Sequence, residues 1–118
     1  MKITEKQLEA LQGLLPDNDV TDNEVGGLEF VVGSDKAGFR TDCCDIDRAI
    51  FCDLLKRAVL DIGEVSFVKV RTSRDWCTVD LLDYDNSGFD KTIVNSDEAP
   101  TELEAWILAV EQLHGRRK

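Results

Sequence analysis

The chain has 118 residues, of which 42% are apolar and 32% are charged, and its formal net charge is −10. This length suits one domain with its own core, and the composition is too apolar for an intrinsically disordered chain. No apolar run approaches the length of a membrane span, and residues 1–7 lack the apolar core of a secretory signal. We therefore expect a single α/β domain over residues 1–118 that is cytoplasmic and does not bind membranes.

The negative charge is concentrated in two segments. Residues 16–47 carry nine acids against two bases, and residues 75–104 carry nine acids against Lys91, so their net charges are −7 and −8. Residues 48–74 have six bases and three acids, a net charge of +3. We expect the acidic segments to repel nucleic-acid phosphates and to attract basic protein surfaces. Direct binding of nucleic acid is therefore not expected.

The N-terminal residues predict a short amphipathic helix. Thr4 and Gln7 form a capping-box pattern that starts it. Leu8, Leu11 and Leu15 recur at helical spacing and give the helix one apolar stripe.

A loop, a strand and a turn are expected next. Residues 17–27 are rich in Asp, Asn and Gly, which is typical of a loop. Residues 28–32 (LEFVV) favour a strand, and residues 33–38 favour a second turn.

The longest helix is predicted for residues 45–60. Apolar residues recur there at helical spacing, and most charged residues fall on the other side. Gly63 is placed to end the helix in a left-handed conformation. The face that we expect to be buried consists of Ile46, Ile50, Phe51, Leu54, Leu55, Ala58 and Val59.

Three strands and a final helix complete the chain. Residues 64–71 and 76–82 are β-prone and flank a turn, which predicts a hairpin, and residues 89–94 add a third strand. Thr101 and Glu104 form a second capping-box pattern that opens the last helix.

The last helix is expected to end at Gly115, and the basic tail, residues 115–118, is expected to fray. The face that we expect to be buried consists of Leu103, Trp106, Ile107, Val110 and Leu113.

These elements predict an α+β fold. We expect a three- to four-stranded, mainly antiparallel sheet that is packed by the long central helix and the C-terminal helix, with a short N-terminal helix.

One segment copies half of a calcium-binding motif. Asp83, Asp85, Ser87 and Gly88 match the first half of an EF-hand loop. Val94 stands where the motif needs a bidentate Glu, and the flanks favour strands where the motif has helices. An acidic hairpin turn accounts for the same residues, so we expect no metal and no cofactor.

The cysteines and the histidine form no catalytic pattern. Cys43, Cys44, Cys52 and Cys77 lack C-x-x-C spacing, and a reducing cytoplasm favours free thiols. His114, the single histidine, lies near the end of the chain with no visible nucleophile and orienting acid. We therefore expect no catalytic residues and no enzyme activity.

Two segments resemble a known family. Residues 41–49 (TDCCDIDRA) and 98–106 (EAPTELEAW) resemble the "STDIAAA"-like and "APEAI..A"-like helix starts of small phage-encoded α-β-α sandwich proteins. The resemblance covers residues 41–113. It implies a phage or prophage origin and a sheet covered by helices. The family has no assigned chemistry, so the resemblance implies no site residues.

The expected function is that of a non-enzymatic interaction protein. We expect a phage accessory factor that binds a basic surface of a host protein in the host cytoplasm, with inhibition of a host-defence nucleoprotein complex by DNA mimicry as one form. A small metal- or thiol-dependent enzyme, a self-associating structural module and a purely solubilising charge remain open alternatives. The expected contact residues are Asp17, Asp19, Asp22, Glu24, Asp80, Asp83, Asp85 and Asp90.

Overall fold

The computed structural model describes residues 3–23, 27–32, 37–42 and 45–117. Its helices are α1 (Glu5–Leu14), α2 (Asp45–Asp61) and α3 (Glu102–Arg117), with a 3-10 turn, η1 (Pro16–Asn18), after α1. Sheet A contains β1 (Thr21–Asp22), β2 (Leu28–Val32) and β3 (Ala37–Arg40), and sheet B contains β4 (Phe67–Thr72), β5 (Cys77–Tyr84) and β6 (Asp90–Asn95).

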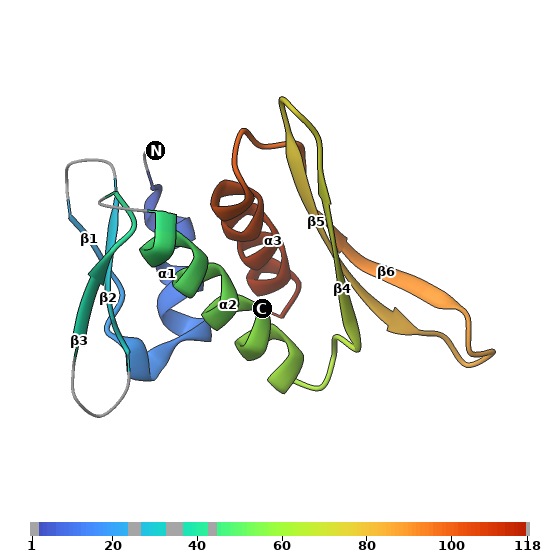
Figure 1. Ribbon diagram of the computed structural model, residues 1–118. Helices are drawn as coiled ribbons and strands as arrows, with labels where there is room; N and C mark the ends of the chain where they lie inside the picture. Colours follow the sequence, from blue (N-terminus) through green and yellow to red (C-terminus); the bar gives the residue numbers. More distant parts are fainter. Residues whose placement is uncertain (1–2, 24–26, 33–36, 43–44, 118) are drawn as a thin grey trace.

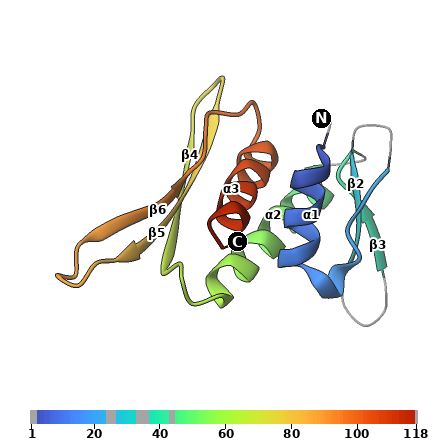
Figure 2. The ribbon, with the colours of Figure 1, turned by 180° about the vertical axis from the view of Figure 1, so that it is seen from behind.

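The described elements form three layers. The helices lie in the middle, sheet A covers one side of them and sheet B the other (Figures 1 and 2). Each sheet is antiparallel with its strands in chain order. The expected α+β class and the three helices are confirmed, while the strands divide into two sheets, so the predicted strand at 28–32 lies away from the meander.

Helix α3 is the centre of the core. It packs against α1, α2, β5 and β6. All five residues of the predicted face are buried, and Ala105 and Ala109 are buried as well. At 100° per residue, the buried positions cover roughly 200° of the helix circumference, about twice the stripe of an ordinary surface helix. This width explains why α3 needs neighbours on more than one side.

Three phenylalanines join sheet A to helix α2. Phe30 and Phe39 are paired in the β2–β3 register, and their rings stack with centroids 5.4 Å apart. The ring of Phe51, from α2, lies 4.8 Å from that of Phe30. Aromatic pairs at these distances are attractive beyond the area they bury. The cluster therefore seals one face of sheet A against the helices.

Sheet B packs one face against the core, and no described helix covers its other face (Figures 1 and 2). Cys77, Val79, Leu81 and Val94 are buried among the core residues that include α3. A register shift between Leu81 and Leu82 interrupts the β5–β6 ladder. Beyond this bulge the hairpin extends past the helices (Figure 1). We call this outer part, residues 82–93, the arm.

Three of the predicted signals at helix ends are confirmed by the structure. The Gln7 N–H donates to Thr4 Oγ1 and the Thr4 N–H donates to Gln7 Oε1, both at 3.1 Å, which confirms the first capping box. Gly63, after α2, has a φ of +83°, the left-handed conformation expected of a C-terminal glycine. At the second box, the Glu104 N–H donates to Thr101 Oγ1 at 3.2 Å, and the Glu104 carboxylate accepts from the Thr101 hydroxyl.

Three expectations for loops and ends were wrong. The predicted loop at 17–27 contains η1 and the short strand β1, and the predicted turn at 33–38 gives way to β3 from residue 37. Gly115 lies inside α3, which continues to Arg117 because the Arg116 guanidinium donates to the Ile93 carbonyl at 2.7 Å. The described part of the tail is therefore helical, and Lys118 lies outside the described residues.

The predicted face of α2 packs against the core except at its start, but only part of it is fully buried. Ile50, Leu54 and Ala58 are partly buried against the core. Phe51, Leu55 and Val59 are buried, together with Cys52, which the apolar pattern did not include. Ile46, in the first turn, is 71% exposed, because the contacts of this turn with residues 40 and 41 are made by the polar Asp47 and Arg48 instead.

Replacement of Trp106 by alanine should strongly destabilise the protein. Trp106 is 1% exposed, and truncation of a buried tryptophan leaves a cavity that costs about 3–5 kcal/mol. Urea unfolding measures the loss. Ile46→Ala, at an exposed position, should change the free energy of unfolding by less than about 0.5 kcal/mol. Equal effects of the two substitutions would contradict the assigned core.

Candidate functional site

The structure separates the predicted contact residues into two groups. Asp17, Asp19 and Asp22 belong to η1, its cap and β1, next to sheet A. The four acids between residues 80 and 90 lie on strands β5 and β6 of sheet B and, for Asp85, in the turn between them, on the other side of the helices (Figure 1). Glu24 lies outside the described residues. The two acidic groups therefore do not form one continuous surface.

Asp80 has a structural role in sheet B. It is 8% exposed, the Asn95 amide donates to its Oδ1 at 2.7 Å, and Arg71 Nη2 lies 3.4 Å from its Oδ2. These contacts connect β5 to both of its neighbouring strands. Because both of its carboxylate oxygens contact groups of the protein itself, Asp80 is not available to bind a partner protein.

Asp85 shapes the turn at the tip of the arm. Its Oδ1 accepts hydrogen bonds from the N–H groups of Ser87 and Phe89, at 2.8 and 2.9 Å. Its backbone carbonyl accepts from the N–H of Gly88, which has a φ of +83° that favours glycine. The residues that resemble half of a calcium loop thus build a hairpin turn held by its own hydrogen bonds.

Asp83 is fixed at the base of the arm. Its carboxylate accepts a hydrogen bond from the Ser66 hydroxyl. This bond, a hydrogen bond from the Tyr84 backbone and the nearby charge of Lys91 lower the pKa of Asp83 against the opposing effect of burial. Asp83 therefore stays ionised and adds negative charge to the arm.

Two aromatic side chains are exposed on the arm, and the sequence analysis did not single them out. Phe89 is 72% exposed and Tyr84 is 57% exposed, although the Tyr84 ring packs against Phe67 at a centroid distance of 5.4 Å. Phe89 directly follows the turn and precedes Asp90. The sequence feature that could have identified this site is Phe89, an aromatic residue next to a polar turn. Together, Asp83, Tyr84, Asp85, Phe89 and Asp90 make the arm the candidate interaction site.

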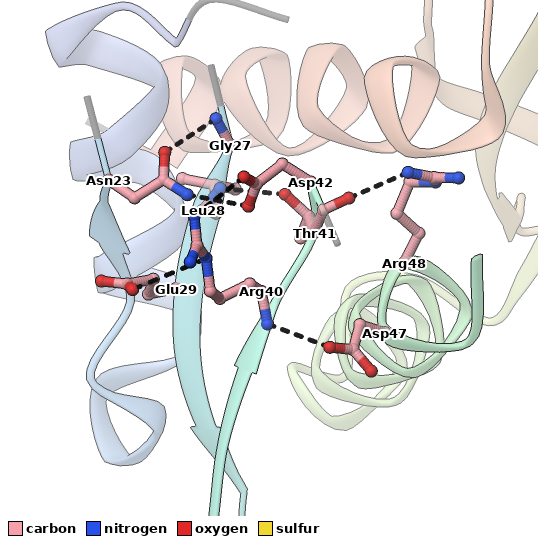
Figure 3. A network of polar contacts seen from close by, with 9 residues as sticks. All are labelled: Asn23, Gly27, Leu28, Glu29, Arg40, Thr41, Asp42, Asp47 and Arg48. Atoms are coloured by element: carbon pink, nitrogen blue, oxygen red, sulfur yellow. Dashed lines mark hydrogen bonds and ion pairs between the residues drawn. The ribbon is translucent and has the colours of Figure 1, made fainter. Parts of the chain in front are cut away.

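A second polar cluster lies where sheet A meets helix α2 (Figure 3). The Arg40 guanidinium contacts Asp42 Oδ2 at 3.0 Å and Glu29 Oε1 at 3.8 Å. The Asn23 amide donates to Asp42 Oδ1 at 2.8 Å, and Asn23 Oδ1 accepts from the Gly27 N–H at 3.0 Å. These bonds close the end of the β2–β3 hairpin.

The same cluster reaches the first turns of α2. The Arg40 N–H donates to Asp47 Oδ2 at 3.1 Å, and the Arg48 guanidinium donates to the Thr41 carbonyl at 3.0 Å (Figure 3). Arg48 also pairs with Asp45. Apart from the Arg48–Asp45 pair, which lies within α2, these contacts connect different segments of the chain, so we interpret this cluster as structural.

Asp42 is the carboxylate most constrained by the cluster. Burial disfavours its ionisation, but hydrogen bonds from its backbone, Arg40 and Asn23, with the charge of Arg40, outweigh burial and lower the pKa of Asp42. Gly27 is packed against it, because a Cβ at Gly27 would lie 2.8 Å from Asp42 Cβ. Asp42 therefore requires glycine at position 27.

The described thiols are poorly suited to catalysis. Cys52 and Cys77 are free and buried. Burial, together with the charge and hydrogen bond of Glu102 and the nearby Cys77, raises the pKa of Cys52 to about 12. A thiol of this pKa is almost entirely protonated at neutral pH and is a poor nucleophile. Cys43 and Cys44 lie outside the described residues.

His114 lines a hollow of about 450 Å³ between α1 and α3. Its Nε2 has no hydrogen-bond partner among the residues that the structure describes, and it lies 3.9 Å from Glu9 Oε1. The other residues that line the hollow are Lys6, Asp97, Leu108, Glu111, Gln112 and Gly115. None of these lining residues is a Ser, Thr or Cys that His114 could activate as a nucleophile.

Within the ranges that the structure describes, no three His, Cys, Asp or Glu side chains are grouped to hold a metal ion. No described helix is both long and apolar enough to cross a bilayer.

Comparisons with protein-family models, curated proteins and solved structures gave no match to this chain.

Asp42→Asn should destabilise the protein in a pH-dependent way. Because the folded-state pKa of Asp42 is lowered, its carboxylate stabilises the fold above the unfolded-state pKa, and this contribution is lost as pH falls through the folded-state pKa. Urea midpoints of the wild type and Asp42→Asn should differ at pH 7 and converge in acid. Asp17→Asn serves as the control. A difference that persists unchanged in strong acid would contradict the assigned role of Asp42.

Cys52 and Cys77 should resist alkylation in the folded protein. At pH 8, a pKa of about 12 leaves roughly one Cys52 thiol in ten thousand ionised, and Cys77 is shielded by burial. Trypsin places them on peptides 49–56 and 75–91. Mass spectrometry after iodoacetamide treatment should find both peptides unmodified in buffer and modified in urea. Rapid native labelling of either peptide would refute the buried placement.

Proposed function

We propose that the protein is a non-enzymatic binding protein whose arm contacts a basic surface of a partner protein. The observation that carries this proposal is the exposure of Phe89 and Tyr84, 72% and 57%, on a hairpin that extends beyond the helices. Large exposed apolar groups beside charged ones are typical of interaction sites.

The chemistry of the arm favours a basic partner with an apolar recess. Burial of an exposed phenylalanine in such a recess contributes about 2 kcal/mol. The carboxylates of Asp83, Asp85 and Asp90 surround the two rings in sequence, against the single base Lys91. Carboxylates around an apolar anchor attract Lys and Arg side chains and repel acidic surfaces. Burial of the aromatic rings would then provide most of the binding free energy, and the carboxylates would provide specificity and speed up association.

The rigidity of the turn supports the same proposal. The hydrogen bonds that Asp85 accepts from Ser87, Gly88 and Phe89 hold the tip of the arm before any partner arrives. The Ser66–Asp83 bond holds its base. A site that is already ordered loses less conformational entropy on binding.

The partner that we propose is a protein of a bacterial host, in line with the resemblance to phage-encoded proteins. We do not extend the proposal to mimicry of DNA. A phosphate-like array needs acids spread over one face. Here the two acidic groups lie on opposite sides of the helices, in a molecule with extents of 44 × 34 × 24 Å.

The decisive experiment compares Phe89→Ala with Ile46→Ala. Both residues are large, apolar and over 70% exposed, but Ile46 lies on α2. Tagged protein is incubated with a bacterial lysate, and captured proteins are quantified by mass spectrometry. A basic partner should be retained by the wild type and Ile46→Ala. Phe89→Ala should lose about 2 kcal/mol, which is roughly thirtyfold in affinity.

The electrostatic part is tested separately with the captured partner. Asp90→Asn and an increase in salt from about 0.05 to 0.5 M should both slow association, because exposed charges are screened at high ionic strength. Binding that is unchanged by Phe89→Ala, or that ignores salt and Asp90→Asn alike, would contradict the proposed site.

A further inference from the structure

The two edges of sheet B differ. On the β6 side, the bulge interrupts the β5–β6 pairing, and the Ile93 carbonyl already accepts a hydrogen bond of 2.7 Å from the Arg116 guanidinium of α3. At the β4 edge, no further strand pairs with Phe67–Thr72 among the described residues, and residues 69–72 are all exposed. An edge with unpaired backbone groups is able to accept another strand.

The β4–β5 register identifies the backbone groups at this open edge. The Ser73 N–H donates to the Trp76 carbonyl, so Ser73 and Trp76 form a hydrogen-bonded pair in the register that continues through the hairpin. Because such pairs alternate along an antiparallel ladder, residues 67, 69 and 71 direct their backbone groups to β5. Val68, Val70 and Thr72 then direct theirs outward.

The side chains at this edge alternate between charged and apolar. Lys69 and Arg71 share one face with their cross-strand partners Asp80 and Thr78, and Val68 and Val70 lie on the other face. Arg71 contacts Asp80, while no described residue forms an ion pair with Lys69. Val70 is 40% exposed. The edge therefore presents a free cation and an apolar side chain on opposite faces.

We propose that β4 binds an extended acidic segment of a partner protein by strand addition. Acidic side chains at alternate positions of the added strand would lie beside Lys69 and Arg71, and apolar ones between them would lie beside Val68 and Val70. The negative charge of the rest of the chain does not prevent this, because exposed charges beyond about 8–10 Å are largely screened at physiological salt.

A second copy of the chain is a poorer occupant. Antiparallel pairing of two β4 strands about Val70 would place Lys69 of one copy directly opposite Arg71 of the other. Like charges in directly opposed positions destabilise a sheet. This surface is separate from the tips of the arm and has the opposite charge, so the inference goes beyond the proposed function.

The test uses a synthetic peptide of alternating glutamate and valine, blocked at both ends, added at millimolar concentration to the isotope-labelled protein. Amide resonances of Val68, Val70 and Thr72 should shift and gain protection from hydrogen exchange. The inward amides of Lys69 and Arg71 should gain less. A lysine–valine peptide of the same length should bind at least roughly fivefold more weakly, because it opposes like charges.

The matched variants are Val70→Pro and Val70→Thr. Proline removes only an outward N–H, which an edge strand tolerates, whereas threonine keeps the N–H and the branched shape. Val70→Pro should keep the wild-type circular dichroism spectrum and bind the acidic peptide at least roughly fivefold more weakly, while Val70→Thr should bind as the wild type does.

Four results would overturn the proposal. They are resonance shifts confined to other elements, equal binding of the lysine–valine peptide, full affinity in Val70→Pro, and a dimer of the free protein, seen by sedimentation, that Val70→Pro dissociates. The last result would assign the edge to a second copy.

Discussion

The arrangement of the whole chain depends on the broad apolar surface of helix α3. A helix with one narrow stripe can rest on a single sheet, but α3 buries alanine at 105 and 109 in addition to the larger residues of its main face. The small alanine side chains let neighbouring elements approach closely, and the bulky Trp106 fills the space beside them. This burial requires α1 and α2 on one side and sheet B on another. Sheet A is then added to the outside of α2 through the Phe30–Phe51 contact.

Features that depend on a few neighbouring residues were predictable from the sequence. The capping box at Thr4, the left-handed Gly63, the long helix and the three-stranded meander all follow from local spacing. The division into two sheets depends on which distant strands pair, and periodicity carries no such information. Gly115 illustrates the same limit, because a glycine that commonly ends a helix is held inside one by a contact of its neighbour Arg116 with β6.

The candidate site was predictable only as a region. The acidic segment 75–104 does contain the arm, but charge counting treated its carboxylates as equivalent. In the structure these carboxylates differ: Asp80 connects neighbouring strands, Asp85 stabilises a turn, and Asp90 is exposed to solvent. The exposure of Phe89 depends on how far the hairpin extends beyond the core, which the sequence pattern does not encode. The sequence analysis therefore identified the charges and missed the exposed aromatic residues that make the arm the candidate interaction site.

The bulge in sheet B determines which residues share a face of the arm. In an uninterrupted ladder, alternation from Val94 would put Thr92 on the core side and Lys91 on the other. The register shift instead pairs Leu82 with Thr92, Asp83 with Lys91 and Tyr84 with Asp90. The one extra residue on β6, Ile93, thus determines which side chains of the outer hairpin share a face. Deletion of that residue would make the ladder regular and keep the observed pairs. Loss of the bulge with the residue retained would instead shift each partner on β6 by one position and move its side chain to the opposite face of the arm.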